Sequence, residues 1–163
     1  MRSLSEREIR ASFVNCSKGE AKRLAVPRDL ATYPWDDLDF LGWRDPAAPQ
    51  RAYLVVESGD GIVGVTLRRA TPAGQARRSM CAMCLTTHSG DGVSLMTARK
   101  AGREGQLGNS VGTYICADLA CSLYLRGKKQ AGPGARPHES LTLDEQIARS
   151  VATLTAFLDK VTE

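Results

Sequence analysis

The chain has 163 residues, of which 42% are hydrophobic and 25% are charged, and 22 Lys and Arg stand against 18 Asp and Glu. This composition excludes collagen, a coiled coil and wholesale disorder, and the length fits one domain with or without a small appendage rather than a large multidomain enzyme. No apolar run approaches the ~20 residues that span a bilayer and no signal peptide opens the chain, so we expect a cytoplasmic protein without membrane contact.

The N-terminal part of the chain predicts short helices followed by a covering segment. Residues 3–24 place apolar side chains among charged ones at helical spacing, with Ser3 or Ser5 as the N-cap, and predict one or two short helices. Residues 27–49 are dense in Pro, Asp and Gly and hold both Trp, so we expect irregular surface turns anchored by aromatic side chains. Its aspartates are typical of solvated or capping groups: Asp36, Asp37 and Asp39.

The middle of the chain predicts β-structure. Two β-rich runs, 51–57 and 62–69, are separated by Ser58–Gly61, whose glycines and aspartate favour a tight hairpin turn. Further along, Val93–Ala98 and Ser110–Cys116 are extended in character and are separated by a glycine-rich turn.

The last third of the chain predicts two helices and a loop between them. Residues 118–127 form a short helix in which Asp118 caps the start and Gly127 closes the end. Residues 127–140 show no periodicity and predict a mobile loop. A long amphipathic helix follows after the cap Thr142, with one apolar face made of Leu143, Ile147, Val151, Leu154 and Leu158.

Four of the five cysteines are spaced as two close pairs. Cys81 and Cys84 are separated by two residues, and Cys116 and Cys121 by four. Each short loop can bring two thiolates to the same side, and four thiolates complete the tetrahedral shell that zinc prefers. The first pair lies in a turn after a strand and the second spans a strand end and a helix start, which is the order of a treble-clef zinc finger. We therefore predict one structural zinc ion.

Other uses of these residues are less well supported. A redox Cys-x-x-Cys would have to open a helix, but a turn with Thr and Gly follows Cys84. His88 stands four residues after Cys84 and could replace one sulfur as a ligand. Cys16 stands alone and is expected to be a buried apolar side chain. A closed four-ligand shell also argues against catalytic zinc, because it leaves no open position for water or substrate.

Together these elements predict an α+β fold, a treble-clef-like zinc finger with β-hairpins, flanked by short N-terminal helices and a long C-terminal helix. We expect an N-terminal helical or irregular segment in residues 1–40 and the zinc-finger domain with its terminal helix in residues 41–163. The sequence has only two His, no nucleotide-type phosphate loop and no nucleophilic Ser elbow, so we expect no catalysis.

Several of these stretches resemble a known family. Residues 41–56, the hairpin 61–69, Cys81-Ala-Met-Cys84 and the run from Gly112 to Cys121 are similar to the treble-clef domain of elongation-factor-G-binding proteins, the family of the FusB-type fusidic acid resistance proteins. The resemblance implies zinc ligation by all four paired cysteines. It also implies a non-enzymatic protein that binds elongation factor G and promotes its release from the ribosome, and we expect this protein to be a monomer. The resistance proteins carry a helical bundle before the finger, whereas only about forty residues precede the similar region here.

The positive charge is concentrated in the same region. Residues 61–130 carry ten Lys and Arg against three Asp and Glu, whereas both flanks are mildly acidic. Such a field attracts acidic or phosphate-rich partners, either elongation factor G or, alternatively, ribosomal RNA and the ribosome, and a solvated face without a partner is the third possibility. The candidate contact residues are Arg68, Arg69, Arg77, Arg78, Arg99, Lys100 and Arg103.

Overall fold

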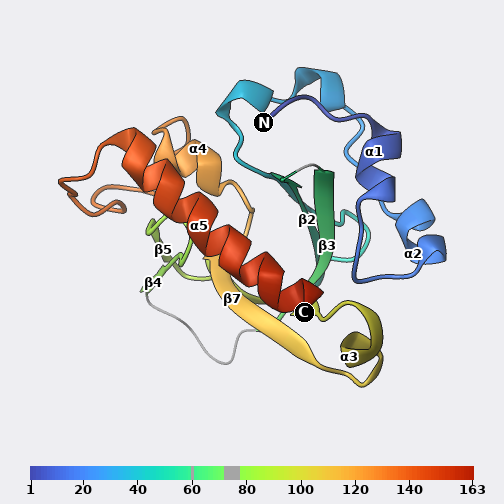
Figure 1. Cartoon of the computed structure of the whole chain (residues 1–163). Coiled ribbons are helices and arrows are strands. Elements are labelled where there is room, and N and C mark those ends of the chain that lie inside the picture. The colour runs from blue at the N-terminus through green and yellow to red at the C-terminus, as the bar shows by residue number, and fades with distance from the viewer. Residues whose placement is uncertain (60, 72–77) are drawn as a thin grey trace.

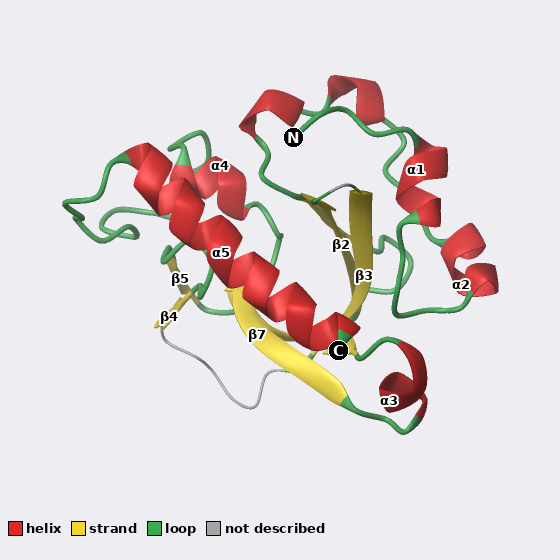
Figure 2. Ribbon diagram, in the orientation of Figure 1, coloured by secondary structure: helices red, strands yellow, loops and turns green. Residues whose placement is uncertain are grey.

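An antiparallel sheet forms the centre of the protein. The computed structural model describes residues 1–59, 61–71 and 78–163, and within them five strands pair in the order β1-β2-β3-β6-β7. A two-stranded sheet pairs β4 with β5 (Figures 1 and 2). The predicted hairpin is present, although Asp60 of its turn lies outside the described residues. The strands are β1 (Leu41–Arg44), β2 (Arg51–Ser58), β3 (Gly61–Arg69), β4 (Arg78–Met80), β5 (Thr87–Ser89), β6 (Val93–Arg99) and β7 (Ser110–Cys116).

Short helices surround the sheet, and one long helix ends the chain. Three of them begin with a capping box, in which a Ser or Thr and a Glu three residues later bond each other's backbone N–H: Ser5, Ser17 and Thr142 are these caps. None of the helices in the described part of the chain is long and apolar enough to cross a membrane. The helices are α1 (Glu6–Ala11), α2 (Lys18–Arg23), η1 (Leu30–Thr32), η2 (Trp35–Asp37), α3 (Gly102–Gln106), α4 (Cys121–Leu125) and α5 (Leu143–Thr162).

The long helix α5 covers one face of the sheet (Figure 1). The predicted apolar face is correct at Leu154 and Leu158 but wrong at Leu143 and Val151, which are 45% and 37% exposed. The first turns of α5 lie beside the loop of residues 127–140 rather than over the sheet, as the bond from Arg136 to Gln146 shows. The buried stripe therefore continues toward the C-terminus, through Phe157 and Val161.

The N-terminal segment covers the opposite face of β1 to β3. Trp43 and Tyr53 pack there with Leu4 and Ile9 in a second apolar cluster. The indole N–H of Trp43 donates to the carbonyl of Ala25 at 2.8 Å, which satisfies the buried polar end of the ring. The two Trp thus anchor the covering segment as predicted, since Trp35 is also buried.

One strand was missed in that covering segment. Residues 41–44 were expected to be irregular, but they form β1, in which Leu41 and Trp43 pair with Val55 and Tyr53 of β2. The strand has only four residues and is followed directly by an Asp-Pro dipeptide. A stretch this short shows little alternation of its own, so the long strand β2 beside it determines its conformation.

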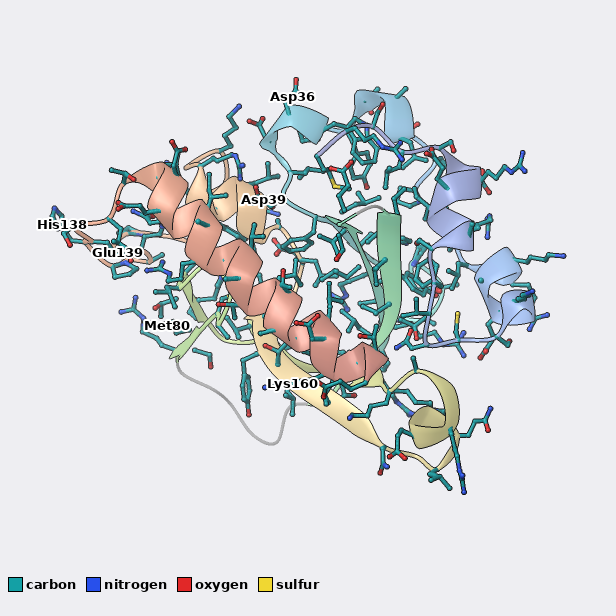
Figure 3. All side chains as sticks on the ribbon, in the orientation of Figure 1. Asp36, Asp39, Met80, His138, Glu139 and Lys160 are labelled. Atoms are coloured by element: carbon teal, nitrogen blue, oxygen red, sulfur yellow. The ribbon has the colours of Figure 1, made fainter. Side chains whose placement is uncertain are left out.

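Two aspartates of the covering segment form ion pairs with the end of α4. Asp39 accepts two bonds from the Arg126 guanidinium, at 2.7 and 2.8 Å, and both side chains are largely buried. Asp37 pairs with Lys128 at 2.6 Å. The expectation of solvated or capping groups is therefore wrong for these two and holds for Asp36, which projects outward at the edge of the molecule (Figure 3).

A buried asparagine completes the sheet where β3 and β6 diverge. These strands pair directly only at Arg68–Thr97 and Arg69–Met96. Two residues beyond the Arg68–Thr97 pair, the Asn15 amide stands between the two strands. It donates to the carbonyls of Thr66 and Arg99 at 3.0 and 2.9 Å and accepts the Thr66 N–H at 2.8 Å. The N-terminal segment thus continues the ladder with a side chain instead of a strand.

We expect Asn15→Ala to destabilise the fold by about 2–4 kcal/mol, because it leaves the Thr66 N–H and the Arg99 carbonyl without their partner in a partly buried place. Urea unfolding followed by circular dichroism measures the loss. Val14→Ala serves as the control, because the neighbouring Val14 side chain is exposed and its backbone bond to Gly64 is retained. A loss equal to that of the control would show that the amide does not support the sheet.

Candidate metal centre

Two tight turns present the four paired cysteines. In the first, the Leu85 N–H donates to the Cys81 carbonyl, and in the second, the Leu119 N–H donates to the Cys116 carbonyl. Leu85 and Leu119 have φ angles of 56° and 59° and are the non-glycine residues with positive φ in the described ranges. Bulky side chains seldom adopt this conformation, and where they do, the surrounding structure holds them in it. Both of these residues with positive φ therefore occur at the cysteine turns, where the backbone bonds to Cys81 and Cys116 close each turn.

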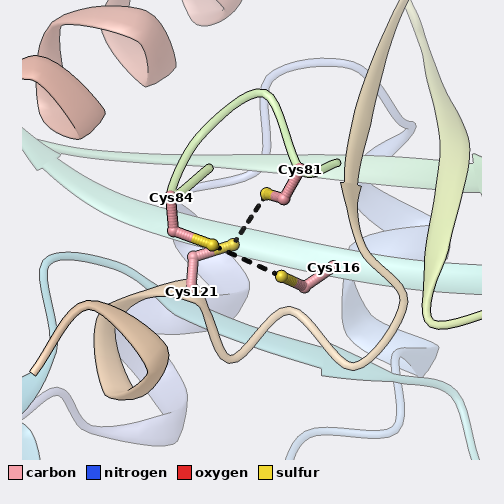
Figure 4. Close-up of side chains that lie close together, drawn as sticks. All are labelled: Cys81, Cys84, Cys116 and Cys121. Atoms are coloured by element: carbon pink, nitrogen blue, oxygen red, sulfur yellow. Dashed lines mark hydrogen bonds between the residues drawn. The ribbon is translucent and has the colours of Figure 1, made fainter. Parts of the chain in front are cut away.

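The four sulfurs converge on one point (Figure 4). Their Sγ atoms all lie within 4.8 Å of one another, and the four residues are fully buried. Cys81 Sγ is 3.6 Å from Cys121 Sγ, and Cys84 Sγ is 3.5 Å from Cys116 Sγ. Bonds of about 2.3 Å from a central zinc ion to four sulfurs would place the sulfurs about 3.8 Å apart. The cluster therefore fits one structural zinc ion, as the cysteine spacing predicted.

The proton balance of the cluster also favours a cation. Burial raises the pKa of Cys121, whereas hydrogen bonds from Cys116 and Cys121 lower the pKa of Cys84. The four thiols therefore compete for protons, and four thiolates this close repel one another in a buried place. A divalent cation removes that repulsion and holds all four in the thiolate form.

Polar groups stand around three of the sulfurs. The Met83 N–H donates to Cys81 Sγ at 3.3 Å, and the Thr86 hydroxyl lies 3.3 Å from Cys84 Sγ. His88 is buried, and its Nε2 lies 3.3 Å from Cys116 Sγ. The half-buried Cys16 is not part of the cluster.

Asp118 stabilises the second cysteine turn rather than capping α4. Its carboxylate accepts the Ala120 N–H at 3.1 Å, the Tyr124 hydroxyl at 2.9 Å and the Lys129 ammonium at 2.8 Å. Burial alone would raise its pKa, but these bonds outweigh burial and hold the pKa of Asp118 below its ordinary value. The helix starts later than predicted, at Cys121, with Ala120 in the cap position. Gly127 closes it with a φ of 67°, as expected.

The predicted contact cations have different surroundings. Arg69 is largely buried and already engaged within the chain, because it pairs with the exposed Asp91 at 2.8 Å and donates to Ser94. Arg77 lies outside the described residues. The others are exposed or, in the case of Lys100, half-buried: Arg68, Arg78, Arg99 and Arg103 are exposed.

One part of the sheet surface carries several of these cations. Arg68 pairs with Thr97, and since side chains alternate along a strand, Thr97 and Arg99 share its face, which Tyr114 of β7 also joins. We call Arg51, Arg68, Thr97, Arg99 and Tyr114 the open sheet face. Tyr114 is 57% exposed.

The sequence reasoning left Arg51 out of the candidate contacts. Arg51 stands directly opposite Arg68 in the β2–β3 register, and two like charges in such a pair destabilise a sheet. The signal that could have identified it is the strand alternation, which places both side chains on one face once the hairpin is known.

Comparison with known proteins agrees with this fold. The family model described as the FBP C-terminal treble-clef zinc-finger matches residues 8–161. Among solved structures, the fusidic acid resistance protein FusC is similar, with a TM-score of 0.56 and 18% sequence identity over 88% of this chain. The match covers 54% of the FusC chain, so the present chain spans about half of that protein's length. None of the curated proteins matches the sequence.

We expect Cys84→Ser to lower the zinc content well below one ion per chain and to cost several kcal/mol of stability, because a three-thiolate site no longer closes the tetrahedral shell. Cys16→Ser is the matched control and should retain the metal. Elemental analysis of the purified proteins and their thermal unfolding measure both effects. Equal metal loss from the two variants would show that the paired cysteines are not the ligands.

Proposed function

Since the chain belongs to the FBP C-terminal treble-clef zinc-finger family, we propose that it is a non-enzymatic protein that binds translation elongation factor G and modulates its release from the ribosome, as in fusidic acid resistance. It acts in the cytoplasm as a monomer. The observation that carries the proposal is the buried four-sulfur cluster, which makes residues 81–121 a rigid platform beside a positively charged sheet face.

The zinc ion in this proposal builds structure. Cys81, Cys84, Cys116 and Cys121 hold it, and four thiolates leave no position at which water or substrate could bind. The bound ion supplies cross-linking: it ties the β4–β5 hairpin to the end of β7 and the start of α4. The four cysteines, once joined in this way, fix the orientation of β7 and of its exposed Tyr114.

The open sheet face is the surface that we assign to the elongation factor. Arg51 and Arg68 face each other across the β2–β3 pair, and carboxylates of a partner relieve this repulsion when they bind between them. Tyr114 adds an exposed aromatic ring, the kind of side chain that dominates binding energy at protein interfaces. Arg78, Lys100 and Arg103 can extend the contact at its margins.

Direct binding to RNA or to the ribosome is the alternative, because guanidinium groups also bind phosphate. Stacking of bases would need several exposed aromatic rings. Of the two tyrosines in the finger, Tyr124 is 5% exposed and bonded to Asp118, so only Tyr114 is accessible. This observation favours the protein partner.

Release of the factor requires that binding discriminate between its states. A binder shifts an equilibrium only by its differential affinity, so the protein must bind the free factor more tightly than the ribosome-bound one. We expect it to reduce the fraction of elongation factor G that sediments with ribosomes in the presence of fusidic acid.

We expect Arg68→Glu and Tyr114→Ala each to weaken binding to purified elongation factor G by about 10- to 100-fold, because both remove contacts from the proposed interface. Lys160→Glu is the matched control, because this exposed lysine lies on α5, which covers the opposite side of the sheet (Figure 3). Calorimetry gives the affinities, and a capture experiment with and without nuclease identifies the partner. Loss of the factor after nuclease treatment would establish the RNA-binding alternative instead.

A further inference from the structure

His88 is held in one orientation against the cysteine cluster. It lies on β5, is 7% exposed, and points Nε2 at Cys116 Sγ over 3.3 Å. On one side its ring meets the edge of Tyr124, with 4.8 Å between ring centroids and an interplanar angle of 83°. On another it packs on Gly92, where an added Cβ would stand 2.6 Å from the His88 Cβ and 3.0 Å from Nδ1. The ring therefore has little freedom to turn away from the sulfur.

The Tyr124 ring that contacts His88 is itself fixed. The Tyr124 hydroxyl donates to Asp118, and Lys129 pairs with the same carboxylate and lies 5.7 Å from the centroid of the Tyr124 ring. This chain of contacts leads from Cys116 through His88 and Tyr124 to the turn between Cys116 and Cys121. It returns to the same pair of cysteines from which it starts.

We propose that His88 is a positioning residue of the zinc site, whose Nε2–H donates a hydrogen bond to the Cys116 thiolate; this inference rests on the zinc site proposed above. A zinc ion bound by four thiolates carries net negative charge, which is costly to bury without hydrogen-bond donors. Such outer donors fix the ligand and weaken its tendency to leave. His88 supplies one to Cys116, as the Met83 N–H supplies one to Cys81.

The geometry favours a donor over a fourth ligand. The mutually close set of ligand atoms consists of the four sulfurs, and the His88 nitrogen is not part of it. A ligand nitrogen would need to approach the common centre of the sulfurs. His88 Nε2 instead contacts Cys116, which already occupies the fourth position.

The first test compares the rate at which a chelator removes zinc from the full-length, zinc-loaded protein. We expect His88→Leu to release zinc about 10- to 100-fold faster than the natural chain, because the sulfur loses its donor while the apolar volume is largely retained. His88→Gln, whose amide can place an N–H near the Nε2 position, should restore much of the slow release. His138→Leu is the matched control, because this other histidine is exposed in the loop of residues 127–140 (Figure 3). Release from His88→Leu at the natural rate would overturn the proposal.

The second test reads the site by spectroscopy, first in the natural chain, which needs no variant, and then in His88→Leu. In the zinc-loaded natural chain, ¹H–¹⁵N correlation of the imidazole should show a proton on Nε2. A bare or metal-bound Nε2 would contradict the hydrogen bond. In the cobalt-substituted protein, His88→Leu should keep the four-sulfur ligand field and shift only its sulfur-to-metal band. If the cobalt-substituted natural chain instead shows the spectrum of three sulfurs and one nitrogen, and His88→Leu changes it, His88 is a ligand. That result would overturn its positioning role.

These readouts are independent of the partner. Zinc release is measured without elongation factor G, so an unchanged rate in His88→Leu removes the role of His88 and leaves the binding function standing. Conversely, if the natural chain does not bind elongation factor G while His88→Leu still releases zinc faster, the binding function fails and the role of His88 stands.

Discussion

The convergence of four buried sulfurs is the constraint on which the finger depends. Strands β4 and β5 have three residues each, too few to form a stable sheet alone, and the turns beside them hold Leu85 and Leu119 at positive φ. Both features cost free energy. Binding of one ion by four thiolates supplies about 10–16 kcal/mol in isolated zinc fingers, which is enough to hold strained turns and short strands in place. The platform therefore exists because the sulfurs share a cation.

Much of this could be predicted from the sequence because the relevant signals are local. The spacing of Cys81 and Cys84 specifies a turn, the glycines near residue 59 specify a hairpin, and Thr142 with Glu145 specifies a helix start. Each pattern spans a few residues and has one favourable geometry. The convergence of the two cysteine pairs, which 31 residues separate, was predictable for a further reason, since zinc prefers a shell of four such ligands.

The parts that sequence reasoning missed depend on contacts between distant segments. Asn15 resembles any polar residue near a helix end until β3 and β6 diverge beside it and leave two backbone groups for its amide. Leu143 is exposed because the sheet does not extend under the first turns of α5. The helical period of the sequence cannot show where the sheet ends. The boundary near residue 40 stays a prediction, although the first forty residues share an apolar cluster with β1 and β2.

The distribution of charge shows why a regional count of cations does not map a surface. The basic excess of residues 61–130 divides in the fold: Arg126 and Lys128 pair with aspartates of the covering segment, and Arg69 pairs with Asp91. Within the described ranges, no ion pair engages Arg51, Arg68 or Arg99. Two aspartates of the covering segment, Asp37 and Asp39, are used at the end of α4, whereas Asp45 of the same segment lies beside Arg51. A count of cations along the sequence therefore includes several whose charge is already paired within the fold, and Arg51 and Arg68, unpaired within the described residues, stand opposite each other in the β2–β3 register.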